Sequence, residues 1–195
     1  MPGRRSRESF AEGRERRAAI DDPAVVLEAA ARFLEARARS VAEVRRRLGR
    51  AGYRVDLIDG AIVRLTELGV LDDEAFGRAW VESRDRARPR GEIALRRELG
   101  RKGVDRTIVD ELLEDRRDAG TVDGVEGPGP DLVAARRLLA RNDRALQRVA
   151  DPRQRRQRAY ALLARNGFDP ETCREAATAF MVAPDDEQPG DMDDT

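Results

Sequence analysis

The sequence predicts an all-α protein, built as an elongated and curved tandem array of three three-helix repeat units. Apolar residues recur at spacings of three and four between Gly and Pro residues, as amphipathic helices require. A Leu-x-Arg-x-Gly-apolar segment occurs three times along the 195 residues. The composition, 40% hydrophobic and 39% charged, suits helices with narrow apolar stripes that bury more surface when repeat units stack.

The first repeat is predicted over residues 23–69. Asp22 before a proline favours a helix start, with Asp as the N-cap. Ser40 and Glu43 have the spacing of a capping box, and Gly52 ends that second helix in a left-handed turn. A third helix follows, with apolar residues at Leu57, Ile58, Ala61, Ile62, Leu65 and Leu68.

The second repeat is predicted over residues 70–118. Acidic residues at 72–74 favour a helix N-terminus, where the helix dipole attracts negative charge. Pro89 and Gly91 interrupt the chain before a short helix that ends at Gly103. The third helix carries Ile108, Val109, Leu112 and Leu113.

The rest of the chain divides by composition. Residues 119–130 are rich in Gly and Pro and are predicted to be a linker without secondary structure. The third repeat is expected over residues 131–183, with helix starts at Asp151 and Asp169. The predicted ends are a mobile charged arm, residues 1–22, and a disordered acidic tail, residues 184–195.

The recurring segment runs from Leu48 to Tyr53, from Leu99 to Val104 and from Leu163 to Phe168. Its Leu is expected to be the last core residue of a short helix. The Gly makes the left-handed turn, and the next apolar residue fills the corner between two helices. One structural role therefore explains all three copies.

The net charge is zero, but the charge is unevenly distributed. Residues 131–183 hold eleven Arg and six acidic residues, whereas residues 184–195 hold six acidic residues and no base. Lys102 is the one lysine among 38 basic residues, which indicates a GC-rich coding bias. The position of an arginine, rather than the number of arginines, must therefore support any binding site.

Several classes of protein are excluded or disfavoured by residue content. With no His and one Cys, the chain lacks the residues for a disulfide, a Cys/His zinc site or a Ser-His nucleophile pair. It also lacks a phosphate-binding P-loop motif. We therefore expect no enzyme activity, no cofactor and no small-molecule substrate. Without a long apolar run, we expect no membrane partner, and the single Cys fits a reducing cytoplasm as the location.

Arginines crowd the second helix of each predicted repeat. One interpretation is a solvated charged face, and the other is a surface that binds acidic protein or phosphate. Eight aromatic residues are too few for a base-stacking platform, and Trp80 and Cys173 are expected in the core. The candidate contacts are Arg45, Arg46, Arg47, Arg50, Arg96, Arg97, Arg101, Lys102, Arg155, Arg156 and Arg165.

Three stretches resemble the RecX family of bacterial regulatory proteins. They are SVAEVRRRL from Ser40, VRLTELGVLDDEAFGRAWV from Val63 and LRRELGRKGV from Leu95, and the resemblance covers about residues 24–182. It implies a regulator in DNA repair, recombination and the SOS response. Such a protein would bind the RecA recombinase filament on single-stranded DNA and restrain its growth, ATP hydrolysis and strand exchange.

Two alternatives stay open. A short helix, a Gly turn and a second helix also occur in helix-turn-helix DNA-binding proteins, and weak direct DNA binding is one expectation for this chain. A helical-repeat scaffold for an unrelated partner would have the same pattern. DNA binding without recombinase would favour the first alternative, and a pull-down that recovers no recombinase would favour the second.

Overall fold

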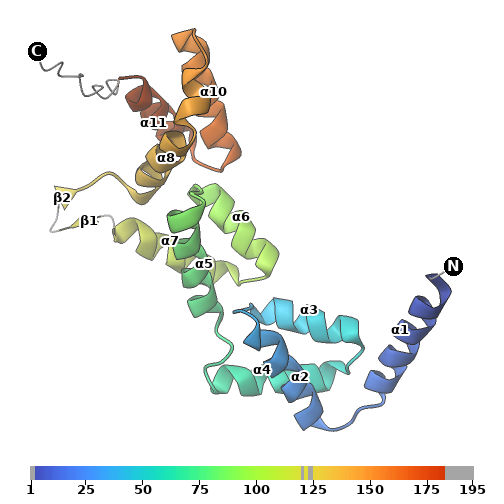
Figure 1. Cartoon of the computed structure of the whole chain (residues 1–195). Coiled ribbons are helices and arrows are strands. Elements are labelled where there is room, and N and C mark those ends of the chain that lie inside the picture. Colours follow the sequence, from blue (N-terminus) through green and yellow to red (C-terminus); the bar gives the residue numbers. More distant parts are fainter. Residues whose placement is uncertain (1–2, 120, 123–124, 183–195) are drawn as a thin grey trace, which may run out of the picture. The chain divides into compact units, whose positions relative to one another are not determined.

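A computed structural model of the chain describes residues 3–119, 121–122 and 125–182, which are almost entirely helical (Figure 1). The fold is therefore all-α, as the sequence predicts. The first seven helices are α1 (Gly3–Ala18), α2 (Pro23–Glu35), α3 (Val41–Ala51), α4 (Val55–Glu67), α5 (Asp73–Ala87), α6 (Glu92–Lys102) and α7 (Arg106–Asp118). The remaining elements are β1 (Thr121–Val122), β2 (Val125–Glu126), α8 (Pro130–Arg141), α9 (Asp143–Gln147), α10 (Pro152–Arg165) and α11 (Pro170–Val182).

The predicted helix starts are confirmed by their hydrogen bonds. Asp22 caps α2 through a bond from the Ala24 N–H to its carboxylate, at 2.9 Å. Ser40 and Glu43 form the complete capping box of α3. Asp151 caps α10 by accepting from the Arg153 N–H at 2.9 Å. Local side-chain chemistry therefore determines where these helices begin.

Four elements were not expected from the sequence. Helix α1 lies within the segment predicted to be a mobile arm, and it is composed mainly of the helix-favouring residues Arg, Glu and Ala. The five-residue helix α9 follows α8 directly. Strands β1 and β2 pair antiparallel within the predicted linker. The Asp-Gly pair between them in the sequence is a strong hairpin signal, which the expectation of a linker overlooked.

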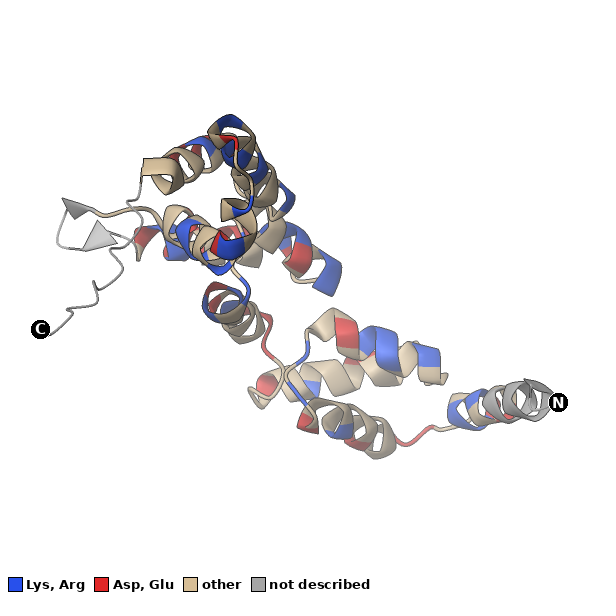
Figure 2. Cartoon of the chain, turned by 45° about the horizontal axis from the view of Figure 1, so that its top comes forward, with Lys and Arg blue, Asp and Glu red and all other residues tan. Residues whose placement is uncertain are grey.

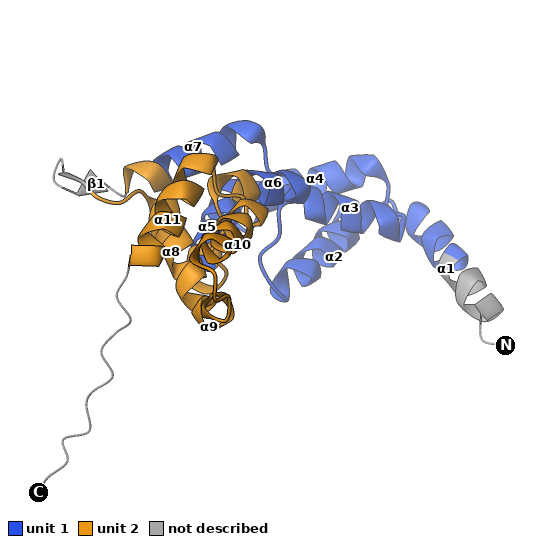
Figure 3. Ribbon diagram, turned by 90° about the horizontal axis from the view of Figure 1, so that it is seen from above, with its two compact units in different colours: residues 1–83, 96–115 blue, residues 84–95, 116–195 orange. Residues whose placement is uncertain are grey.

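The chain forms two compact units (Figure 3). Unit 1 comprises residues 1–83 and 96–115, and unit 2 comprises residues 84–95 and 116–195. Helices α5, α6 and α7 each contribute residues to both units. The second predicted repeat is therefore divided between the units, although the repeat ranges themselves stay a prediction.

Each unit has its own apolar core. In unit 1, α2, α3 and α4 pack together around Val26, Ala30, Val44, Leu48, Ile58, Ala61, Ile62, Leu65 and Leu71. In unit 2, α8, α10 and α11 pack around Leu132, Ala134, Ala135, Leu139, Leu146, Ala159, Leu163, Phe168, Cys173, Ala176 and Ala177. The narrow apolar stripes read from the sequence form these cores.

Cys173 and Trp80, both expected in the core, differ in how deeply they are buried. Cys173 is fully buried in the core of unit 2, as predicted. Trp80 is only half-buried, and its indole N–H donates to Glu98 at 2.9 Å. Among the described residues, no helix is long and apolar enough to cross a bilayer. The acidic tail, residues 184–195, lies outside the described residues.

Candidate macromolecule-binding surface

The candidate basic residues lie on α3, α6 and α10, as expected from the recurring segment. Basic and acidic residues are interspersed over the helices of both units (Figure 2). The candidates therefore differ in what surrounds each side chain. Those differences separate residues that hold the fold together from residues that can meet a partner.

Arg45 and Arg96 make the same internal contact in consecutive repeats. Arg45 of α3 binds Asp59 of α4, with Nη2 at 2.6 Å from Oδ1. Arg96 of α6 forms the equivalent ion pair with Asp110 of α7. In both cases the acid lies fourteen residues after the arginine, and it ties the second helix of a repeat to the third. Both arginines are thus already paired with a carboxylate.

The start of α3 contacts the end of α6, and we call this contact the α3–α6 junction. The Ser40 hydroxyl donates to the Lys102 carbonyl at 2.6 Å, and the Val41 N–H donates to Asp73 at 2.9 Å. Gly103 lies so close to Ala42 that a Cβ on Gly103 would be 2.4 Å from the Ala42 Cβ. Only glycine fits here, since its φ of 81° is also in the left-handed region.

Charged groups complete the α3–α6 junction. Lys102 Nζ lies 2.8 Å from Glu43 and 4.7 Å from the centre of the Trp80 ring. Burial raises the pKa of Glu43, but hydrogen bonds from Lys102 and the Ser40 N–H outweigh it and leave the pKa below its ordinary value. Burial raises the pKa of Asp73. Lys102 is thus already engaged with Glu43 and the Trp80 ring within this junction.

A matching contact in unit 2 joins the start of α6 to the end of α10, and we call it the α6–α10 junction. The Gly91 N–H donates to the Asn166 carbonyl at 3.1 Å, and the Glu92 N–H donates to Asp131 at 2.9 Å. A Cβ on Gly167, whose φ is 81°, would lie 2.4 Å from the Ala94 Cβ. Each feature has a counterpart at the α3–α6 junction.

Arg116 is the most buried of the paired cations at the α6–α10 junction, with 8% of its side chain exposed. Its guanidinium binds Asp85 at 2.9 Å and Asp131 at 2.6 Å. Burial lowers the pKa of Arg116, but the two carboxylates outweigh it and raise the pKa. For Asp131 burial dominates, and its pKa is raised. No sequence pattern signals this cluster, because its members are far apart along the chain.

The turn at Gly52 is covered by α1. A Cβ on Gly52, whose φ is 101°, would lie 2.9 Å from the Arg14 carbonyl oxygen. The Ala51 carbonyl accepts from Arg17 at 3.4 Å. The residues before the other two turn glycines are Lys102 and Asn166, and their backbone carbonyls also accept hydrogen bonds. Helix α1 therefore contacts the first turn in the way that preceding helices contact the other two.

Three of the candidates share one position and are exposed. Arg50, Arg101 and Arg165 each lie two residues before the glycine of a turn. Neither Arg50 nor Arg165 has an ion pair or side-chain hydrogen bond within the described part of the chain, and Arg101 donates only to the Arg97 carbonyl, at 3.4 Å. The position recurs in both units and leaves its guanidinium available.

The other candidates have varied surroundings. Arg46 donates to the Lys102 carbonyl at 3.3 Å, and Arg47 lies over the Phe33 ring at 5.7 Å. Arg97 is exposed. Arg155 donates to the Val149 carbonyl at 3.1 Å, whereas Arg156 lines a groove between α10 and α11.

Over the described ranges, no group of three or more Cys, Asp and Glu side chains is placed to hold a metal ion.

Two family profiles match the chain. The profile described as RecX, first three-helix domain, matches residues 27–65, and RecX, second three-helix domain, matches residues 72–113. These matches cover the α3–α6 junction. The crystal structure of RecX from Lactobacillus salivarius superimposes with a TM-score of 0.68 at 18% identity, over 82% of this chain and 97% of that one. It shares the fold.

Curated relatives extend the match over most of the chain. A regulatory protein RecX of Mycolicibacterium vanbaalenii is 32% identical over 157 residues, covering 77% of this chain and 79% of the relative. That of Chlorobium phaeobacteroides is 34% identical over 147 residues, covering 75% and 87%. That of Pelodictyon phaeoclathratiforme is 31% identical over 162 residues, covering 82% and 92%. With this identity and coverage, and the two domain matches, the chain belongs to the RecX family of regulatory proteins.

Proposed function

We propose that this protein binds the RecA recombinase filament on single-stranded DNA and inhibits its growth, ATP hydrolysis and strand exchange. It acts by binding rather than by catalysis. Membership of a family of regulatory proteins supports a macromolecular partner. The identity of that partner rests on the resemblance of the motifs to RecX proteins.

One structural observation carries the choice of contact residues. Arg50, Arg101 and Arg165 recur at one position of the helix turn and are exposed, whereas Arg45, Arg96 and Lys102 are engaged with acids of the same chain. A guanidinium that is not already paired can form bidentate contacts with a carboxylate or phosphate of a partner. We propose these three arginines as the principal contacts within the wider candidate set.

Several such contacts on one chain would act together on a repetitive partner. When one contact holds the chain on the filament, the others bind as intramolecular events, so the total affinity exceeds that of any single contact. This explains how a regulator could act at substoichiometric amounts. It also predicts that binding weakens as salt screens the exposed charges.

The test is DNA-dependent ATP hydrolysis by the cognate RecA recombinase, titrated with the wild-type protein. A variant with Arg50→Glu, Arg101→Glu and Arg165→Glu should require about tenfold or more protein for half-inhibition, which corresponds to ~1.4 kcal/mol. The matched control reverses three other exposed arginines, Arg88, Arg144 and Arg148, and should inhibit like the wild type.

Two results would reject parts of this proposal. If the wild type does not inhibit at any ratio or at low salt, recombinase is not its partner. If the two triple variants inhibit equally, the shared turn position is not the contact. Binding to single-stranded DNA alone, measured by fluorescence anisotropy, separates a direct DNA-binding protein from a filament-binding one.

A further inference from the structure

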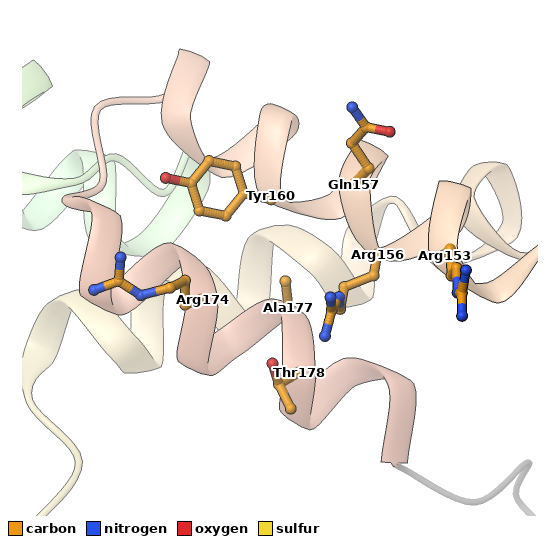
Figure 4. A pocket seen from close by; sticks show the side chains of 7 residues that line it. All are labelled: Arg153, Arg156, Gln157, Tyr160, Arg174, Ala177 and Thr178. Atoms are coloured by element: carbon orange, nitrogen blue, oxygen red, sulfur yellow. The ribbon is translucent and has the colours of Figure 1, made fainter.

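A cationic groove lies between α10 and α11 in unit 2 (Figure 4). Its volume is about 470 Å³. In Figure 4, Arg156 projects from α10 toward Ala177 and Thr178 of α11, and Arg153 and Arg174 lie toward opposite ends. The lining residues are Arg153, Arg156, Gln157, Tyr160, Arg174, Ala177 and Thr178.

No acidic residue balances the three arginines of this groove. Its lining contains no Asp or Glu, and none of the three guanidiniums has an ion pair within the described ranges of the chain. The nearby acids serve other contacts. Glu175 of α11 pairs with Arg136 of α8 at 3.6 Å, and Asp169 caps α11 through the Thr172 N–H. The groove therefore carries three positive charges together with hydroxyl and amide donors.

We propose that the chain's own acidic tail, residues 184–195, occupies this groove as an intramolecular anionic ligand. The tail has six acidic residues and no base, so its charge is complementary to that of the groove. It follows closely on α11, which forms one wall of the groove. The negative charge that would otherwise have to come from a separate ligand is thus present on the same chain, directly after α11.

The length of the chain allows this contact. Arg174 lies eight residues before Val182, the last residue of α11, a distance of about 12 Å along the helix. Asp185, Asp186 and Glu187 lie three to five residues after Val182, within about 10 to 17 Å of extended chain. A tail that turns back along α11 therefore brings these three acids level with the arginines.

Attachment favours the tail over a free polyanion. A short flexible linker gives a tethered ligand an effective concentration in the millimolar range, so that even weak carboxylate–guanidinium contacts become populated. Because the charges are exposed, the contact should weaken in salt. While bound, the tail would screen this face of unit 2 from phosphates and from acidic proteins.

The test is paramagnetic relaxation enhancement on the full chain, with a spin label attached at Thr195→Cys. The native Cys173 is buried and should not react with the label. We expect selective loss of amide signal intensity in residues 153–160 and 174–178. The loss should disappear at about 0.5 M salt, where the Debye length is about 4 Å.

Two variants define the contact. Replacing the six tail acids by Asn or Gln should abolish the signal loss, as should Arg153→Glu with Arg156→Glu and Arg174→Glu. The matched control, Arg88→Glu with Arg144→Glu and Arg148→Glu, reverses three exposed charges of the same unit outside the groove and should retain the signal loss. Amide spectra of each variant would confirm that the fold is intact.

Three outcomes would overturn the proposal. In one, the signal loss falls on α3 or α6, so that the tail binds other arginines. In another, no loss occurs at low salt. In the third, single-stranded DNA shifts the amide signals of the groove equally with native and neutralised tails, which would make the groove a nucleic-acid site that the tail does not occupy. None of these outcomes depends on recombinase binding.

Discussion

Glu43 shows how one side chain serves two levels of structure. It closes the capping box of α3 and accepts from Lys102, which is at the end of α6. Within one repeat the residue is a helix cap, and between repeats it is half of an ion pair. The side chain is 14% exposed, so its charge is largely shielded from solvent.

The depressed pKa of Glu43 gives a pH prediction. The unfolded chain binds a proton at about pH 4.3, above the pKa of the folded state, so the carboxylate stabilises the fold above that pH. The stabilisation is lost as the pH falls through the folded pKa. Glu43→Gln should lower the free energy of unfolding by about 1–2 kcal/mol at pH 7 and by much less near pH 3.

Urea denaturation at several pH values would measure this difference. Asp73, whose pKa is raised by burial, is present in both proteins, so most of its own titration cancels in the comparison. The control is Glu67→Gln, which removes an exposed ion pair with Arg64 and should change stability by less than about 0.5 kcal/mol. If Glu43→Gln lowers the free energy of unfolding by the same amount at every pH, the stabilisation does not come from the charged form of Glu43.

The recurring element is the glycine turn together with the helix start that it contacts. At the α3–α6 and α6–α10 junctions, an acid of one helix accepts from the first N–H of another, and a glycine lies against an alanine. The leucine before each turn is buried, so the motif also anchors each core. One short motif therefore ends a helix and forms the contact with the start of an earlier helix.

A comparison of two glycines distinguishes the cost of a strained backbone from the cost of crowding at the α3–α6 junction. Gly69 has a positive φ of 67°, but a Cβ added there would have no atom within 4 Å, whereas Gly103 has both a positive φ and the Ala42 contact. Gly69→Ala should cost about 1–2 kcal/mol, and Gly103→Ala a further ~1–3 kcal/mol. Gly100→Ala, inside α6 with open space, should be neutral or stabilising.

The measurement is the free energy of unfolding from urea denaturation, with the slope checked for each variant. Equal penalties for Gly103→Ala and Gly69→Ala would show that the α3–α6 junction yields easily to an added methyl group. A penalty for Gly100→Ala comparable to that for Gly103→Ala would show that helix propensity, rather than the junction, determines the ranking.

In the molecule as a whole, the boundaries between the two units fall within helices rather than in loops. Because α5, α6 and α7 each contribute to both units, we predict that the units unfold together. Trp80 is the only tryptophan and lies in unit 1, so its fluorescence reports on that unit. Gly167→Ala strains unit 2 and should lower the transition temperature seen by Trp80 by about 5 °C or more.

Thermal unfolding followed by Trp80 fluorescence and by far-ultraviolet circular dichroism provides the comparison. Coincident transitions in the wild type, and equal shifts in Gly167→Ala, are expected from a single cooperative structure. A Trp80 transition that stays at the wild-type temperature while the circular dichroism shifts would show that the units unfold separately.

The sequence alone predicted most of the helices and several of their ends. Asp22, Ser40, Glu43 and Asp151 act through hydrogen bonds to residues two or three positions away, so local sequence is sufficient to identify them. It missed α1 and α9, which have few apolar residues to mark a stripe. The Asp-Gly hairpin signal was present but was assigned to the linker.

The candidate site was predicted only as a set of arginines. Their recurrence is visible in the sequence, but their availability depends on which acids fold against them. Arg45 and Arg50 are equivalent in sequence as basic residues of one helix, yet only Arg45 meets an aspartate of the next helix. Arg116, which no sequence pattern singles out, binds acids 31 and 15 residues away.

The sequence by itself determined the helical class, the caps and the glycine turns, because these depend on side chains acting within one or two turns of the backbone. Tertiary structure alone decided which charges pair, that Lys102 contacts Glu43 and Trp80, and that Arg153, Arg156 and Arg174 share a groove without an acid. The reason is physical: ion pairing and burial depend on distances between helices, which no local pattern of residues specifies.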